Sequence, residues 1–312
     1  VVVVSVEDYP RTLTEFERRF ATEGACRAYS AQLRWPTGFQ CPRCATGEGW
    51  MTHRGLIMCR QCGHQASVTA GTIFHRSHLP LHTWFRTMWW VTNQKHGVSA
   101  LGLQRLLGLG SYETAWSCLQ KLRRAMVRPG RDRLSGEVEV DETFVGGVEK
   151  GGGRRHLGHK ALVVVAAQVD GRGIGRIRMK RIPDASAENL LPFVQSAVEP
   201  RSVVITDGWA GYSGLKEAGC RHKIRTRGPD PERASKLLPR VHRVASLLKR
   251  WLLGTHQGAV SRDQLDYYLD EFTFRFNRRT SRHRGKLFYR LVEQAVAIEP
   301  IPFPELIARN RL

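Results

Sequence analysis

Two cysteine pairs constrain the folding of this chain more than any other feature of its sequence. Each pair has the spacing CxxC, Cys41 with Cys44 and Cys59 with Cys62, and 14 residues separate the pairs. Thiolates spaced in this way turn through a knuckle, so four of them can meet one tetrahedral Zn²⁺ while the spacer forms strands. A redox dithiol, the alternative, needs only one CxxC. The pattern predicts a zinc ribbon over residues 37–70, with these four cysteines as ligands of a structural Zn²⁺.

The charge balance of the chain indicates a polyanionic partner. Lys and Arg total 49 against 28 Asp and Glu, a formal net charge of +21 at pH 7. Residues 221–250 hold ten basic residues and two acids, and residues 273–290 hold seven basic residues and no acid. Such clusters raise the local potential and attract the phosphates of nucleic acids. A ribosomal or otherwise generally basic protein is the alternative, but the clustering argues against a mere solubility effect.

A helix-turn-helix pattern follows the cysteine region. Residues 80–94 read as a helix, and helices over 99–107 and 111–126 flank a glycine-containing turn. An all-helical packing domain is the alternative, but a neighbouring zinc ribbon in a basic chain favours a DNA-binding region over residues 71–130. On the last helix, apolar residues share one face and leave polar side chains for solvent or a DNA groove. These are Tyr112, Thr114, Gln120, Lys121, Arg123 and Arg124.

Beyond a linker near residues 129–132 the pattern becomes that of an α/β fold. Strands are expected over 137–147, 160–169 and 173–182, then a helix over 186–198, a strand ending at Asp207, a short helix, an edge strand near 222–226, and helices over 236–253 and 263–277. Hairpins first, then alternating helix and strand, predict a mixed sheet with helices on its faces. A helical segment over residues 1–36 precedes the ribbon.

Two acids occupy strand positions in this pattern. Asp141 lies inside an apolar run, and Asp207 closes another. Reactive groups gather at strand ends in α/β sheets, and a buried carboxylate is costly without a cation or a partner. A structural salt bridge is the alternative for Asp141. The pattern leaves open whether Asp141 or one of its neighbours, Glu139 and Glu142, is the leading acid.

A basic helix carries two further candidates. His242 follows Asp207 after 34 intervening residues, and Lys249 follows His242 by seven positions. Seven residues make almost two full helical turns, so both side chains lie on one side, away from the apolar stripe. They are either merely solvated or face a cleft that holds DNA. Arg243 and Arg250 of the same helix are expected to contact DNA.

The order of these motifs resembles the zinc-ribbon insertion-sequence transposases of the DDE superfamily. The likeness covers residues 15–290 and includes VDETFVGG, ITDGWAGY, HRVASLLKRWLLGTHQG and YLDEFTFRFNRR. It implies a ribonuclease-H-like mixed sheet with flanking helices over residues 134–290, and a C-terminal tail over 291–312. Asp141 matches the family's first acid and Asp207 its second. The family's third acid is a glutamate, and His242 stands at that position here. Lys249 fits the basic position that follows seven residues later.

The resemblance implies a transposase that binds the terminal inverted repeats of its element and cuts and joins DNA strands with two divalent ions, Mg²⁺ or Mn²⁺. Asp141 would bridge both ions, Asp207 would hold one, His242 would bind or orient at the second, and Lys249 would contact a phosphate. Imidazole suits softer ions, so we expect Mn²⁺ to support activity at least as well as Mg²⁺. The implied partner is double-stranded DNA of element ends and target, bound by a homo-oligomer.

Two other functions fit the same sequence. A DNA-binding regulator would keep the fold after losing catalysis, and His242 in place of glutamate would be a sign of that loss. A structure-specific nuclease with the same core would cut branched DNA without needing a particular end sequence. Asp141, Asp207 and Lys249 are intact and favour the transposase.

The hydropathy pattern predicts no association with a membrane. No apolar run approaches the roughly 20 residues that span a bilayer, and the opening Val1–Val4 is far too short for the apolar region of a signal peptide. We therefore expect a cytoplasmic protein, and the resemblance implies a prokaryotic, nucleoid-associated one.

Overall fold

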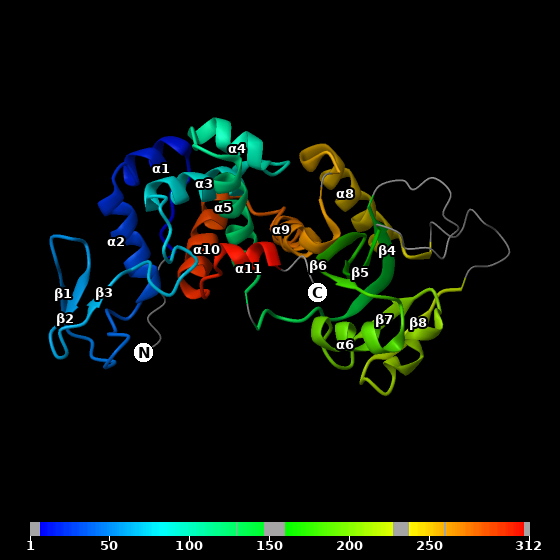
Figure 1. Cartoon of the computed structure of the whole chain (residues 1–312). Coiled ribbons are helices and arrows are strands. Elements are labelled where there is room, and N and C mark those ends of the chain that lie inside the picture. The colour runs from blue at the N-terminus through cyan, green and yellow to red at the C-terminus, as the bar shows by residue number, and fades with distance from the viewer. Residues whose placement is uncertain (1–6, 129, 147–159, 227–236, 259, 309–312) are drawn as a thin grey trace. The chain divides into compact units, whose positions relative to one another are not determined.

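The chain divides into two compact units, shown in Figure 1. This computed structural model describes residues 7–128, 130–146, 160–226, 237–258 and 260–308. The first unit combines Val1–Arg128 with Thr280–Ala308, and the second contains Pro129–Arg279. The expected helical segment and C-terminal tail each run partly outside the described residues.

A three-stranded antiparallel sheet forms the small ribbon of the first unit. Its strands β1 (Gly49–Met51), β2 (Ile57–Cys59) and β3 (Gln65–Ala66) lie in that order. The guanidinium of Arg34 donates hydrogen bonds to the Ser67 and Val68 carbonyl oxygens at 3.0 and 2.8 Å. These bonds tie the exit of the ribbon to the helix that precedes it.

An aromatic core joins the N-terminal helices to a helix from the end of the chain. Phe288 is fully buried, and its ring centroid lies 5.3–5.8 Å from those of Phe16, Phe20, Phe85 and Trp89. Edge-to-face and tilted pairs at such distances stabilise a core beyond the area they bury. The helices involved are α1 (Leu13–Arg19), α2 (Glu23–Arg34), α3 (Leu81–Asn93) and α10 (Arg284–Ala297).

Helix α10 therefore belongs with the N-terminal helices, and so does α11 (Phe303–Ala308). The domain boundary placed at residue 290 from the sequence lies inside α10. That boundary came from the extent of the family resemblance, and a sequence likeness does not say which core a segment joins.

The expected helix-turn-helix pair is present as α4 (Ala100–Leu107) and α5 (Tyr112–Ala125). Ser99 and Ser111 cap the two helices, and Gly108 ends α4 with a φ of 61°. Most of α5 is buried, however, because α4, α10 and α11 all pack against it. Gln120 and Arg123 are 0% and 2% exposed, so the prediction that they face solvent or a DNA groove is wrong.

The second unit is built on a five-stranded sheet in the order β6-β5-β4-β7-β8. Strands β4, β5 and β6 pair antiparallel, while β7 and β8 run parallel to β4. This mixed sheet with flanking helices is the predicted ribonuclease-H-like fold class. The strands are β4 (Glu137–Val145), β5 (Ala161–Asp170), β6 (Gly173–Ile182), β7 (Val203–Thr206) and β8 (Arg221–Ile224).

Alternating side chains of β4 face two different layers. Val138 and Val140 are fully buried in a core with residues of α6 (Ala187–Ala197) and η1 (Ala210–Leu215). The residues between and after them point to the opposite face, where α8 (Pro239–His256) packs on β4 and β5. The short η3 (Arg262–Gln264) leads into α9 (Leu265–Asn277), which packs along β6.

Membrane-spanning helices are not found among the residues described: every helix there is too short or too polar to cross a bilayer.

Candidate functional site

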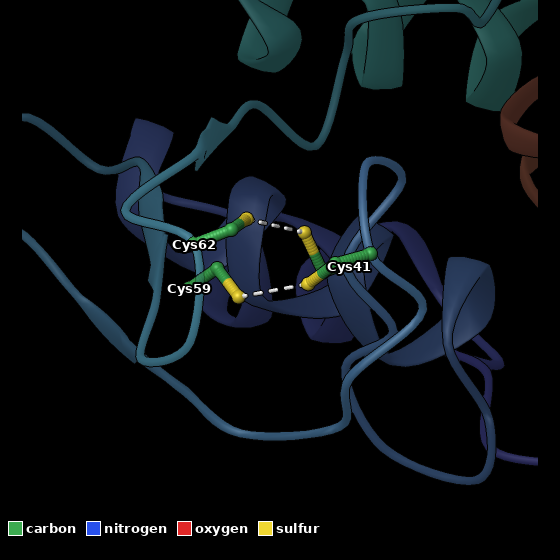
Figure 2. A group of neighbouring side chains, drawn as sticks. Cys41, Cys59 and Cys62 are labelled. Atoms are coloured by element: carbon green, nitrogen blue, oxygen red, sulfur yellow. Dashed lines mark hydrogen bonds between the residues drawn. The ribbon is translucent and has the colours of Figure 1, made fainter.

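The four predicted zinc ligands lie together in the ribbon. The Sγ atoms of Cys41 and Cys62 are 3.7 Å apart, and those of Cys44 and Cys59 are 3.5 Å apart. Figure 2 shows Cys41, Cys59 and Cys62 directing their sulfur atoms toward a common point. Sulfur atoms at 2.3 Å from a tetrahedral Zn²⁺ would be about 3.8 Å from one another. The cysteines therefore fit the metal that a zinc ribbon holds.

The two knuckles that present these sulfurs have the same backbone form. In each, the residue after the second cysteine has a positive φ: 58° at Ala45 and 67° at Gly63. Its N–H donates to the carbonyl oxygen of the first cysteine, at 2.9 Å in one knuckle and 3.1 Å in the other. This left-handed turn returns the chain toward the metal side and accounts for the CxxC spacing.

The pairing of β4 with β7 brings the two predicted catalytic acids to one level of the sheet. Glu139 is opposite Ile205 in this parallel pair. Two residues further on, the same register places Asp141 level with Asp207, which follows β7 directly. Side chains at one level of parallel neighbours point to the same face, and the strands are about 4.8 Å apart. Asp141 is thus on the face that α8 covers, and Asp207 follows the neighbouring strand at the same level.

The third predicted residue, His242, contacts the first acid. Its Nε2 atom lies 3.1 Å from Asp141 Oδ2, and the two side chains are 38% and 19% exposed. The other Asp141 oxygen, Oδ1, accepts the Glu142 backbone N–H at 2.9 Å. Among the neighbouring acids of β4, Asp141 is therefore the one that His242 meets.

Asp207 is held by a tight turn at the end of β7. Its Oδ1 atom accepts the backbone N–H of Trp209 at 3.0 Å, and the side chain is exposed. Gly208 has a φ of 87°, and a Cβ atom there would lie 2.8 Å from Ile224 Cγ2, so only glycine fits. The indole N–H of Trp209 donates to the Ala185 carbonyl oxygen at 2.7 Å. These bonds fix the direction of the carboxylate.

A third carboxyl group, that of Glu142, lies near Asp141 and Asp207 at this end of the sheet. Glu142 faces the opposite layer, where it accepts a hydrogen bond from the Tyr212 hydroxyl. Burial raises the pKa of Glu142 to about 7; the Tyr212 bond opposes this rise, and the charges of Asp141 and Asp207 add to it. Carboxylates that repel one another in this way are relieved by a divalent cation with oxygen ligands.

The three predicted catalytic ligands do not form a single compact group. Among the residues that the structure describes, only the four cysteines include three or more such groups whose ligand atoms all lie within 4.8 Å of one another. The structure therefore brings His242 to Asp141 but does not gather Asp141, Asp207 and His242 around one point.

Basic side chains of α8 extend from this site. Lys249 is exposed, and its pKa is lowered by partial burial and by the nearby positive charge of Lys160. Arg243 and Arg250, the predicted DNA contacts on this helix, are also exposed.

The predicted DNA contacts on α5 are placed differently. Tyr112 is 54% exposed, while Thr114 and Arg124 are half-buried. On α5 only Tyr112 and Glu113, at the start of the helix, are exposed; the side chains after them are half-buried or buried.

The sequence left Glu139 open as a candidate for the leading acid, but it did not show that this residue bonds to the start of α8. Glu139 is fully buried and accepts the backbone N–H of Arg240 at 2.7 Å. Its position two residues before Asp141 signalled that both acids share a face. No local signal identified a partner 101 positions later in the chain.

Two family models match parts of this chain. Residues 133–277 match the ISXO2-like transposase domain, and residues 21–65 match the transposase zinc-ribbon domain. The first match contains all the predicted catalytic residues, and the second contains all four cysteine ligands. A relative from Halobacterium salinarum, described as an uncharacterized protein in transposable element ISH50, is 27% identical over an alignment of 290 residues. The match covers 86% of this chain and 95% of the relative.

Proposed function

We propose that this chain, an insertion-sequence transposase by its zinc-ribbon and ISXO2-like domains, cuts DNA at the ends of its element and joins those ends to a target. The observation that carries the proposal is the contact of His242 with Asp141, on a strand whose parallel neighbour β7 leads directly into Asp207. A structural ion pair between Asp141 and a protonated His242 is the alternative, and it predicts that Asp141→Asn leaves cleavage intact.

The site residues have distinct tasks in this proposal. Asp141, Asp207 and His242 would hold two divalent ions, Mg²⁺ or Mn²⁺; Asp141 would serve both, Asp207 one and His242 the other. Such ions would supply charge stabilisation for the attacking and leaving oxygens of an in-line displacement. Lys249 holds a non-bridging phosphate oxygen by charge, and it keeps the DNA backbone against the two acids.

DNA binding is divided between the two units in this proposal. The zinc ribbon and the first turn of α5, with Tyr112 and Thr114, contact the terminal repeats, and Arg124 contributes charge. Arg243 and Arg250 contact the backbone near the cut. We infer a homo-oligomer on paired ends of double-stranded DNA, acting on the nucleoid in a prokaryotic cytoplasm.

Strand transfer tests the proposed function directly. With Mn²⁺, the full chain should join a labelled end oligonucleotide to a supercoiled plasmid, and should ignore an oligonucleotide with a scrambled end. Gel analysis of the labelled plasmid measures the product. Specific end binding without any transfer would indicate a catalytically decayed regulator. Cutting of branched DNA whatever its end sequence would indicate a structure-specific nuclease.

The imidazole of His242 should set the metal preference. Because nitrogen ligands favour softer ions, the wild-type rate with Mn²⁺ should equal or exceed that with Mg²⁺, and His242→Glu should shift the ratio about tenfold toward Mg²⁺. Cleavage rates in titrations of each metal measure this ratio. Ser246→Ala, an exposed position on the same helix, should leave it unchanged. If His242→Ala lowers the cleavage rate equally with both metals and His242→Glu leaves the rate unchanged, the imidazole nitrogen does not determine the metal preference.

A further inference from the structure

Helix α8 receives its N-terminal cap from strand β4. Leu238 at the N-cap makes no side-chain cap bond, and the first turn of α8 contains no acid. Instead, Glu139 Oε2 accepts the backbone N–H groups of Arg240 and Val241, at 2.7 and 3.2 Å. A carboxylate in this position satisfies two helix-end donors and also interacts favourably with the helix dipole.

Two guanidinium groups compensate the charge of this buried carboxylate. Arg240 Nη1 lies 3.0 Å from Glu139 Oε1, and Arg225 Nη1 lies 3.7 Å from the same oxygen. Glu139 is 0% exposed, so the loss of either its charge or its partners leaves unsatisfied buried groups. The site around Glu139 therefore requires a negative charge, and it requires oxygen acceptors that point at the start of α8.

Both arginines also bond to neighbouring backbone. Arg240 donates to the carbonyl oxygens of Gly171 and Gly173, at 2.7 and 2.9 Å, in the turn between β5 and β6. Arg225, just after β8, donates to the Leu237 carbonyl oxygen at 2.9 Å. The start of α8 is thus bonded to β4, to the turn between β5 and β6, and to the residue that follows β8.

This attachment determines which side of α8 faces the acids. Glu139 and Asp141 are two residues apart on β4 and point to the same face, while their partners Arg240 and His242 are two residues apart on α8. One residue of helical slip rotates a side chain by about 100°, which would turn His242 away from Asp141. The cap therefore sets the rotation of α8 about its axis.

We propose that Glu139, together with Arg240, is a positioning residue that holds the first turn of α8 so that His242 lies against Asp141. The role of Glu139 in catalysis rests on the proposed function of that site. The capping of α8 by Glu139 does not depend on that function.

Hydrogen exchange at the first turn of α8 tests the cap without any assay of activity. Glu139→Gln keeps the shape but directs an amide N–H₂ at donors, so exchange of the amides of residues 240–242 should rise about tenfold or more. Glu137→Gln is the matched control on the same strand. Its partner is Lys223 at 3.5 Å, with both side chains about half exposed, so exchange should not change. Unchanged exchange in Glu139→Gln overturns the proposal.

A double-mutant cycle separates positioning from a general loss of folding. In Mn²⁺-dependent cleavage, Glu139→Gln should weaken the apparent Mn²⁺ affinity about 10–100-fold, and excess Mn²⁺ should restore the rate. In a His242→Ala background the same change should cost less than about threefold, because its effect acts through His242. An equal penalty in both backgrounds overturns the positioning role. Absence of cleavage by the wild-type chain contradicts the proposed function instead, and hydrogen exchange still decides whether Glu139 holds α8.

Discussion

Replacement of Asp141 by asparagine should abolish strand cutting while leaving the binding of end DNA intact. The carboxylate would serve both ions, so its loss removes several kcal/mol of charge stabilisation, which corresponds to a rate reduction of about 10³-fold or more. Asp207→Asn should have a similar effect. Cleavage of a labelled end duplex measures the rate, and gel shift of the same duplex measures binding.

A matched control is available on the same sheet. Asp170 is exposed at the end of β5, and Asp170→Asn changes the same charge without approaching the proposed site. Its cleavage rate should stay within about twofold of wild type. Retained cleavage in either Asp141→Asn or Asp207→Asn would refute the assignment of these acids.

Removal of zinc should unfold the ribbon and with it the recognition of the element's ends. A structural zinc site contributes on the order of 10 kcal/mol to folding, and the ribbon has only three short strands to replace it. Cys59→Ser or a strong chelator should therefore release one zinc per chain, expose the amides of residues 49–66 to rapid exchange, and eliminate end-specific binding. Metal analysis, hydrogen exchange and gel shift measure the three effects.

The control for this experiment is Cys220→Ser in the second unit. Cys220 is buried far along the chain from the four clustered sulfurs and should change neither zinc content nor end binding. Persistence of a protected ribbon after complete removal of metal would contradict the role of zinc in its folding.

Much of the second unit was predictable because its signals are local. Apolar runs and the Gly171–Gly173 turn predicted the β5–β6 hairpin, and the boundaries of β4 and α6 differ from the predicted ones by one or two residues. The resemblance implied the fold class, while the strand order came only from the structure. The catalytic assignments of Asp141, Asp207, His242 and Lys249 remain predictions for the experiments above.

Predictions about α5 failed where they depended on surroundings. Helical periodicity placed Arg123 on a polar face, and a polar face is normally solvated. The structure buries Arg123 because α4 and the C-terminal α10 and α11 pack around α5. Periodicity describes one helix, and it contains no information about how many neighbours that helix has.

The sequence by itself determined the ribbon, the strands and the positions of the candidate acids, because cysteine spacing and hydrophobic period act over a few residues. Only the tertiary structure decided that α10 completes the N-terminal core through Phe288, and that Glu139 caps a helix 101 residues away. Both depend on contacts between distant segments. Their geometry exists only once the sheet and helices have packed, and so no local pattern can encode it.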